Sequence, residues 1–235
     1  MQKTKLFCFP YAGGSASFYS PWKRQLGPFI ELHAFEYAGR GRRVTDSLSV
    51  SISAIVDDIM NQLTPHFCTS SYALFGHSMG GSVVYELTKR ISDAKLPMPR
   101  EVFISGKGAP HLPKRHTILY KLADPEFRVN LIKLGGVSDD FFDTPELAQL
   151  FLPVIRNDLR LAETYVVNEI RPIDCNISVL HGKEEDLNEE EINEWKHYTH
   201  GNCRWYSFSG GHFFIKDHTT DITGIISRTL LQKSW

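Results

Sequence analysis

The sequence has few cysteines, and those it has form no metal-binding pattern. Its 235 residues include four cysteines and no Cys-x-x-Cys pair, at positions Cys8, Cys68, Cys175 and Cys203. This scatter argues against a structural zinc site and against a disulfide framework, and it is typical of proteins from a reducing compartment. We therefore expect no metal ion and a cytoplasmic location.

The sequence also lacks an excess of either charge and lacks a long apolar run. With 26 Lys and Arg against 27 Asp and Glu, the formal net charge is -1, which gives the whole molecule no electrostatic attraction to nucleic acid or to an anionic membrane. No apolar stretch approaches the ~20 residues of a membrane helix. Pro10 and Gly13 interrupt the apolar start of the chain too early for a signal peptide. We expect neither nucleic acid nor a membrane as a partner.

What the sequence does contain is an alternation of strand and helix patterns. Hydrophobic residues make up 42% and charged residues 23%, as in ordinary globular proteins, and the length suits a single domain over 1–235. Apolar runs predict strands at Lys5–Phe9, Leu32–Tyr37, Tyr72–Phe75, Glu101–Ser105, Ile177–His181 and Cys203–Phe208. Helical spacing of apolar residues separates them, as over Ile52–Leu63, Glu190–Tyr198 and Thr219–Leu231. This pattern predicts an α/β fold, with a mainly parallel sheet covered by helices on both faces.

The alternation is interrupted between Lys107 and about Arg171. This segment holds no convincing strand, but it holds apolar residues at helical spacing, such as Phe127, Leu131 and Leu134. The pattern predicts a helical insertion between two strands of the sheet.

The stretch Gly76-His77-Ser78-Met79-Gly80 is a G-x-S-x-G motif between a predicted strand and a predicted helix. A strand that turns directly into a helix forces its corner residue into a strained backbone and holds that side chain clear of the sheet. Glycine is needed at both ends because a Cβ would collide across the tight turn. We predict that Ser78 is a nucleophile for a carbonyl carbon and that His77 is a packing neighbour, not its base.

A serine hydroxyl needs a base to become a nucleophile, and in this architecture an acid and then a histidine follow the serine along the chain. His212 is the best candidate for the base, because it follows the last predicted strand in a loop with two glycines. The acid should follow the preceding strand, where Glu184, Glu185 and Asp186 occur. Any of the three carboxylates could orient the imidazole. The shorter stem of Asp, and its common use in hydrolases of this fold, favour Asp186.

The negative charge that develops on a carbonyl oxygen under attack needs two backbone N–H donors. One is expected from Met79, the residue after the nucleophile. The other is expected from the loop Tyr11-Ala12-Gly13-Gly14-Ser15 after the first strand, with Ala12 as the first choice and Tyr11 as the second. A plain turn would also explain this loop.

Together these motifs resemble the type II thioesterases, free-standing α/β-hydrolases that accompany nonribosomal peptide and polyketide synthases. The matching stretches run over nearly the whole chain: FPYAGGSASFY (Phe9–Tyr19), YAGRGRR (Tyr37–Arg43), LFGHSMGG (Leu74–Gly81), KLGGV (Lys133–Val137), FLPVIRNDLRLAETY (Phe151–Tyr165) and FSGGHFFI (Phe208–Ile215).

The chain departs from the family pattern at three positions. Tyr11 stands where the family usually has His, and Ala38 where it usually has Pro. The family's acid loop reads G-x-x-D, and the third residue after Gly182 is Glu185. This spacing favours Glu185 as the acid, whereas a shift of one residue would favour Asp186.

The resemblance implies hydrolysis of acyl thioesters from the phosphopantetheine arm of acyl or peptidyl carrier domains, without a cofactor, in order to clear stalled or misprimed groups. It implies that the insertion is a lid and that an acyl pocket is lined by Phe141, Phe142, Leu150 and Phe151, although packing inside the lid would explain these residues too. The locally basic stretches Arg40–Arg43 and Gly106–His116 could steer an acidic carrier, but a solvated loop is the commoner reason for such runs. We expect a monomer.

Two other functions fit parts of the sequence. An esterase or lipase would use the same three residues on oxygen esters, and the leaving group distinguishes it from a thioesterase. A non-catalytic binding module on a hydrolase scaffold is opposed by the complete set of serine, histidine and acid. Failure of a fluorophosphonate to label Ser78 would favour the binding module.

Overall fold

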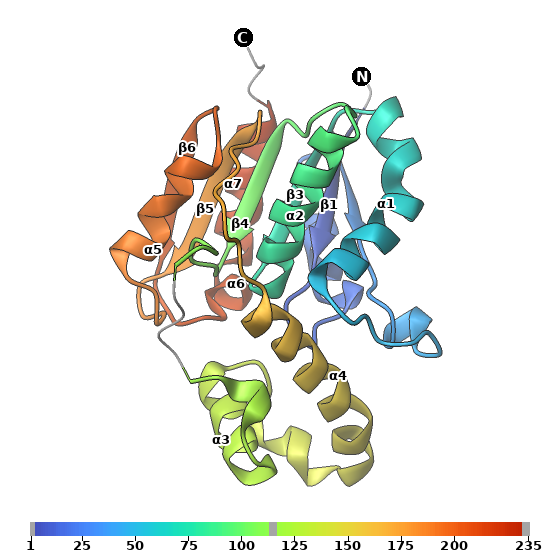
Figure 1. Cartoon of the computed structure of the whole chain (residues 1–235), viewed down its shortest axis with the longest axis vertical. Coiled ribbons are helices and arrows are strands. Elements are labelled where there is room, and N and C mark those ends of the chain that lie inside the picture. Colours follow the sequence, from blue (N-terminus) through green and yellow to red (C-terminus); the bar gives the residue numbers. More distant parts are fainter. Residues whose placement is uncertain (1–2, 113–116, 232–235) are drawn as a thin grey trace.

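The computed structural model describes residues 3–112 and 117–231. Six parallel strands form one sheet in the order β2-β1-β3-β4-β5-β6 (Figure 1). The strands are β1 (Thr4–Phe9), β2 (Ile30–Ala34), β3 (Tyr72–His77), β4 (Glu101–Ser105), β5 (Asn176–Gly182) and β6 (Cys203–Phe208). The predicted α/β class with a parallel sheet is confirmed.

Helices follow most of the strands. The α-helices are α1 (Ile52–Thr69), α2 (Met79–Asp93), α3 (Asp124–Leu134), α4 (Pro145–Thr164), α5 (Glu189–Asn193), α6 (Phe214–Asp217) and α7 (Thr219–Leu231). Short 3₁₀ helices are η1 (Ala16–Arg24), η2 (Gly41–Arg43), η3 (Leu119–Lys121), η4 (Asp139–Asp143) and η5 (Glu194–Tyr198). The helix predicted over Glu190–Tyr198 is therefore α5 continued by η5, and α1 extends six residues beyond the predicted end at Leu63.

Successive side chains of the central strands point to opposite faces of the sheet, so they pack alternately into two apolar cores. Leu74 of β3 and Ile104 of β4 pack with α1 and α2 on one face. Phe75 and Phe103, their neighbours in sequence, pack with α7 and η1 on the other. Figure 1 shows α1 and α2 on one side of the sheet and α7 on the other. The sheet is thus buried on both faces, as parallel sheets usually are.

β2 is shifted from its predicted position at Leu32–Tyr37. The strand pairs with β1 only as far as the Cys8–Ala34 register, and Phe35 N–H still donates to the Cys8 carbonyl (2.9 Å). Phe35 and Tyr37 are buried by side-chain packing after the strand has ended. Their apolar character correctly predicted that they are buried, but it wrongly predicted that they belong to the strand.

The segment between β4 and β5 carries α3 and α4 and extends beyond the carboxyl ends of the strands (Figure 1). Its own apolar cluster is centred on Phe127 and Leu131 of α3 and on Ile155 and Leu159 of α4. α3 ends at Gly135, whose φ of +86° places it in the left-handed conformation that favours glycine at a helix end. This segment lies over the edge of the sheet where ligands bind in α/β proteins.

None of the helices described in residues 3–112 and 117–231 is long and apolar enough to cross a membrane.

Candidate active site

Ser78 occupies the sharp corner between β3 and α2. Its φ of +56° and ψ of -114° are strained for a residue with a side chain. A Cβ at Gly76 would lie 2.0 Å from the Gly80 carbonyl oxygen, and one at Gly80 would lie 2.1 Å from the Phe9 carbonyl oxygen in β1. Glycine is therefore required at 76 for the turn itself and at 80 for the close packing of α2 on β1.

His212 lies in the loop after β6 and faces Ser78. Its Nε2 is 2.9 Å from Ser78 Oγ, although the two residues are 134 positions apart. The loop reaches this place because it packs on the bare backbone of Gly182, where a Cβ would lie 2.4 Å from the Gly210 carbonyl oxygen. The structure thus brings together the two residues that the sequence identified as nucleophile and base.

Glu185 completes the hydrogen-bonded series. Its Oε1 lies 2.6 Å from His212 Nδ1, and its Oε2 accepts from the Gly182 N–H at 2.8 Å. The Glu185 side chain is only 2% exposed. Because a carboxylate only accepts, Nδ1 carries the proton of the neutral ring, and Nε2 is free to accept from the serine hydroxyl. Asp186 and Glu184 are exposed, and the structure as described gives neither a hydrogen bond to His212.

His77 is a fully buried neighbour of this series. Its Nδ1 lies 2.9 Å from Ser105 Oγ, and its ring lies 5.1 Å from the ring of His212, centroid to centroid. Burial lowers the pKa of His77 well below its usual value, and the nearby His212 lowers it further. His77 is therefore a neutral ring packed against the His212 imidazole.

Of the two predicted oxyanion donors, Met79 directly follows Ser78, and Ala12 belongs to the loop after β1. Met79 is the first residue of α2, so its N–H has no carbonyl four residues back within that helix. Ala12 lies in the loop after β1, and the Tyr11 ring of that loop is 6.0 Å from the ring of His77 and 4.8 Å from that of Phe213. The hydrogen bonds described for this loop use the N–H groups of Gly13 and Gly14 but not that of Ala12.

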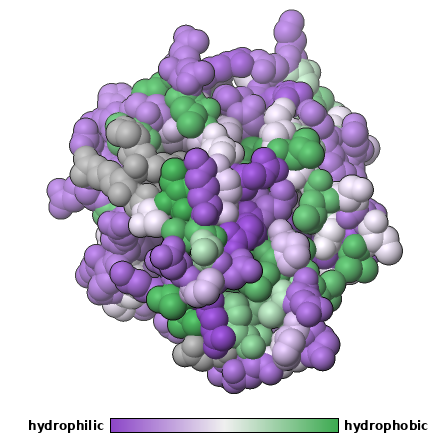
Figure 2. All heavy atoms as spheres, turned by 60° about the horizontal axis from the view of Figure 1, so that its bottom comes forward, coloured by the Kyte–Doolittle hydropathy of each residue, from purple (hydrophilic) through white to green (hydrophobic). Residues whose placement is uncertain are grey.

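A cleft of about 800 Å³ opens beside Ser78 and His212. Its apolar lining includes Leu112, Leu134, Leu159, Leu187 and Phe213. Figure 2 views the end of the molecule that carries the insertion and shows hydrophobic and hydrophilic residues interspersed over it. Residues after the strands and residues of the insertion both line the cleft, so it lies between the sheet edge and the insertion. Its volume suits a small-molecule acyl group.

Lys107 is the most enclosed cation of the cleft lining. Its stem packs on the first turn of α2, since a Cβ added at Gly81 would lie 3.1 Å from Lys107 Cβ. Burial lowers the pKa of Lys107 to about 8, against the opposing effect of Glu163 and Glu191. Glu163 accepts from the N–H groups of Leu119 and Tyr120, so it is held by the chain of the insertion.

The predicted acyl-pocket residues lie elsewhere and need correction. Phe141, Phe142 and Phe151 pack around the apolar cluster inside the insertion, and Leu150 is 53% exposed. None of the four lines the cleft at Ser78. Helical spacing located their elements, but it did not determine which side of the insertion faces the sheet.

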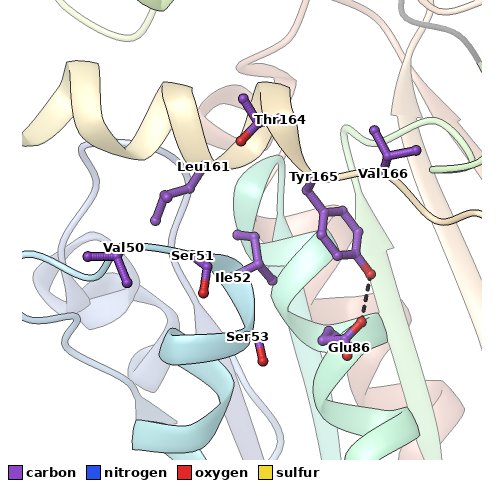
Figure 3. A pocket seen from close by; sticks show the side chains of 9 residues that line it. All are labelled: Val50, Ser51, Ile52, Ser53, Glu86, Leu161, Thr164, Tyr165 and Val166. Carbon is purple, nitrogen blue, oxygen red and sulfur yellow. Dashed lines mark hydrogen bonds between the residues drawn. The ribbon is translucent and has the colours of Figure 1, made fainter.

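A second, smaller hollow of about 290 Å³ lies where the start of α1, α2 and the end of α4 meet (Figure 3). Its lining consists of Val50, Ser51, Ile52, Ser53, Glu86, Leu161, Thr164, Tyr165 and Val166. Tyr165 donates its hydroxyl to Glu86 Oε2 (2.9 Å), as the dashed line in Figure 3 marks. This hollow shares no residue with the cleft at Ser78, and it marks the place where α4 is fastened to the body of the molecule.

The sequence did not indicate that Arg40 and Asp158 lie near the site. Arg40 belongs to the stretch predicted as a basic steering loop, but its side chain is 4% exposed and forms a two-point ion pair with Asp158 of α4. Their separation of 118 positions leaves no local signal for the pairing. In the other basic stretch, residues 113–116 lie outside the described residues.

In the described part of the chain, no group of three or more His, Cys, Asp or Glu side chains is arranged to hold a metal ion.

The chain is similar to several known proteins over nearly its whole length. A family model described as a thioesterase domain matches residues 4–230. Thioesterase PikA5 of Streptomyces venezuelae is 32% identical over 231 residues, which cover 97% of this chain and 81% of that protein. The crystal structure of ClbQ from the colibactin NRPS/PKS pathway is 35% identical, with a TM-score of 0.91 and 97% of both chains covered. BorB, the type II thioesterase of the borrelidin cluster, is 32% identical with a TM-score of 0.87, over 97% of this chain and 93% of BorB.

Proposed function

The chain belongs to the thioesterase family, and from this premise we propose that it hydrolyses acyl thioesters held on the phosphopantetheine arm of carrier domains in nonribosomal peptide or polyketide biosynthesis. Its resemblance to type II thioesterases, which the motifs indicated, is confirmed. The observation that carries the proposal is the hydrogen-bonded series of Ser78, His212 and Glu185 beside an acyl-sized cleft in a chain of this family.

In the first half of the proposed reaction, the thioester carbon is attacked by Ser78 Oγ. His212 Nε2 removes the hydroxyl proton as the new C–O bond forms, because it already faces Oγ at 2.9 Å. The carbonyl oxygen becomes an oxyanion, and the N–H groups of Met79 and Ala12 stabilise it. The C–S bond then breaks, His212 returns the proton to the pantetheine sulfur, and an acyl-serine remains.

In the second half, water takes the place of the thiol. His212 removes a proton from the water as it attacks the acyl-serine, and the proton then passes to Ser78 Oγ when the acid is released. Glu185 stays ionised and holds the imidazole in the tautomer that both steps need. Its second hydrogen bond, from the Gly182 N–H, supports this role because it fixes the carboxylate. The reaction needs no cofactor other than the pantetheine of the substrate.

Carrier domains are proposed as the partners because ClbQ and BorB, to which this chain is similar, come from pathways of this kind. The phosphopantetheine arm is long and slender, and it would carry the acyl group into the cleft below the insertion. We propose that this insertion acts as a lid. The clearing of misprimed acyl groups, the monomeric state and the cytoplasmic location stay predictions.

The proposal is tested by hydrolysis of a panel of acyl groups loaded on a carrier protein. The wild-type chain should release several short acyl groups, and Ser78→Ala should release none. Ser47→Ala is the matched control, since Ser47 is an exposed serine in the segment before α1 and should behave as wild type. Cleavage of simple oxygen esters with the thioesters left intact would replace the proposal by an esterase. Failure of a fluorophosphonate to label Ser78 would favour a binding module.

A further inference from the structure

A buried ion pair joins the insertion to the body of the molecule next to the active site. Arg40 Nη2 donates to Asp158 Oδ1 (2.9 Å), and Nη1 donates to Oδ2. The two side chains are 4% and 2% exposed. Such pairs usually add little to stability, because the loss of hydration offsets the attraction of the two charges. The pair is therefore better explained by the groups that it holds in place than by a gain in stability.

The ion pair also holds the backbone of the loop after β1. Asp158 Oδ2 accepts from the Gly13 N–H at 2.8 Å, and Arg40 Nη1 donates to the Gly14 carbonyl at 3.2 Å. The N–H of Gly13 and the carbonyl of Gly14 are thus fixed by the same pair of side chains. The residue that immediately precedes this double contact is Ala12.

Direct packing adds to these hydrogen bonds. Gly13 has a φ of +77°, and a Cβ there would lie 2.5 Å from Ile155 Cγ1 of α4. The loop backbone therefore lies flat against α4, one turn before Asp158. The Gly14 N–H closes the loop on the Tyr11 carbonyl at 2.9 Å. The conformation of residues 11–14 is set by α4, a helix of the insertion, and not by the sheet alone.

α4 is itself fastened to the body at its carboxyl-terminal half. Asn157 Nδ2 donates to the Ser49 carbonyl (3.1 Å), and the Tyr165 hydroxyl donates to Glu86 across the hollow in Figure 3. Asp158 lies between these two contacts in sequence. The anchor of the loop is therefore held in place by contacts that do not involve the active site.

We propose that Asp158 and Arg40 are positioning residues, which hold the Tyr11–Gly14 loop so that the Ala12 N–H points at the oxyanion. The inference rests on the proposed function and adds to it a dependence of the oxyanion hole on the seating of α4. A donor acts efficiently only when its direction is fixed before charge develops. The ion pair supplies this fixing from outside the cleft, without touching the substrate.

The test compares Asp158→Asn and Arg40→Lys with Asp93→Asn. Asp93 forms the same kind of two-point pair with Arg171, but both partners of that pair are exposed and belong to α2 and to the segment after α4. The substrate is the butyryl thioester of N-acetylcysteamine. Affinity for a trifluoromethyl ketone, which binds serine as an oxyanion, is the second readout, and the midpoint of thermal unfolding is the third.

Loss of one oxyanion donor lowers kcat by about 10²-fold or more. We expect Asp158→Asn to lower kcat by about 10- to 100-fold with KM little changed, and to weaken the ketone by a similar factor. Asp93→Asn should leave all three readouts near wild type. Unchanged kcat and ketone affinity in folded Asp158→Asn would overturn the inference, whereas a wild-type chain inert toward thioesters would instead overturn the proposed function.

Asp158→Glu serves if Asp158→Asn does not fold. This variant keeps the charge and lengthens the stem by one methylene, so the pair can form while the Gly13 contact is displaced. Loss of kcat with an unfolding midpoint near wild type supports a positioning role. Wild-type kcat in the folded Glu variant overturns it.

Discussion

His77 and His212 lie ring against ring, with centroids 5.1 Å apart and planes inclined by 35°, but only His212 reaches Ser78. The two imidazoles differ because His77 is fully buried and bonded to Ser105, whereas His212 is 20% exposed and bonded to Glu185. His212 is thus the candidate base, and His77 is a buried ring that packs against it.

The first prediction concerns the stability of this buried ring in acid. The folded chain holds the pKa of His77 well below 6.5, while the unfolded chain binds a proton near 6.5. Unfolding therefore takes up a proton below pH 6.5, so this residue makes stability fall as the pH falls. Urea unfolding should show a smaller acid loss in His77→Gln than in wild type, and an equal loss would contradict the pKa shift.

The second prediction separates the two carboxylates that the sequence left open. Glu185→Gln should lower kcat by about 10³-fold or more, because an amide oxygen that accepts from the Gly182 N–H leaves the NH₂ donor facing Nδ1, which favours the wrong tautomer of the imidazole. Asp186→Asn, one residue further along and exposed, should keep kcat within about twofold of wild type. Steady-state hydrolysis of one thioester by both variants decides the matter. The reverse order of effects would assign the role to Asp186.

The third prediction concerns Lys107 in the cleft. Its folded pKa is about 8, against 10.5 when it is unfolded, so the unfolded chain binds the extra proton between these values. Stability linked to this residue therefore rises as the pH rises from 8 to 10.5. Lys107→Met should be more stable than wild type at pH 7, by up to roughly 3 kcal/mol, and the difference should vanish near pH 10.5.

Denaturant unfolding at several pH values measures this difference directly. Lys133→Met is the control, because Lys133 lines the same cleft but is exposed. Its difference from wild type should not vary with pH. A Lys107→Met difference that is constant from pH 7 to pH 10.5 would show that the ammonium is well solvated.

The sequence could locate Ser78 and His212 because their signals are local. Close backbone contacts require glycine beside the serine, at Gly76 and Gly80, and a φ of +100° favours glycine after the last strand, at Gly210, so both places can be recognised in the sequence. The candidate acid has no such local signal. Its loop follows from the end of β5, but the choice of Glu185 depends on a side chain that turns back to the Gly182 N–H. Residue spacing limits the candidate acids to the carboxylates of this loop, and the conformation of the loop determines which of them reaches His212.

Contacts between distant segments explain the other failures. The pairing of Arg40 with Asp158 joins a loop after β2 to a helix of the insertion, and neither residue differs locally from an ordinary surface charge. Likewise, apolar spacing identified the helices of the insertion without showing which side packs inward. Phe142 was therefore assigned to an acyl pocket, although it packs in the insertion's own cluster.

The last prediction uses this correction to locate the acyl group. Ala162 of α4 lines the cleft and is partly exposed, so Ala162→Leu adds bulk where an acyl chain would lie. We expect kcat/KM to fall about tenfold or more for octanoyl thioesters and to change little for acetyl thioesters, since a few methylenes that no longer fit are worth about 1–3 kcal/mol each. Phe142→Leu is the matched control. It removes an aromatic ring from the insertion's cluster, so it should lower the unfolding midpoint while the ratio of octanoyl to acetyl hydrolysis stays at the wild-type value. A changed ratio in Phe142→Leu and an unchanged one in Ala162→Leu would return the acyl pocket to the interior of the insertion.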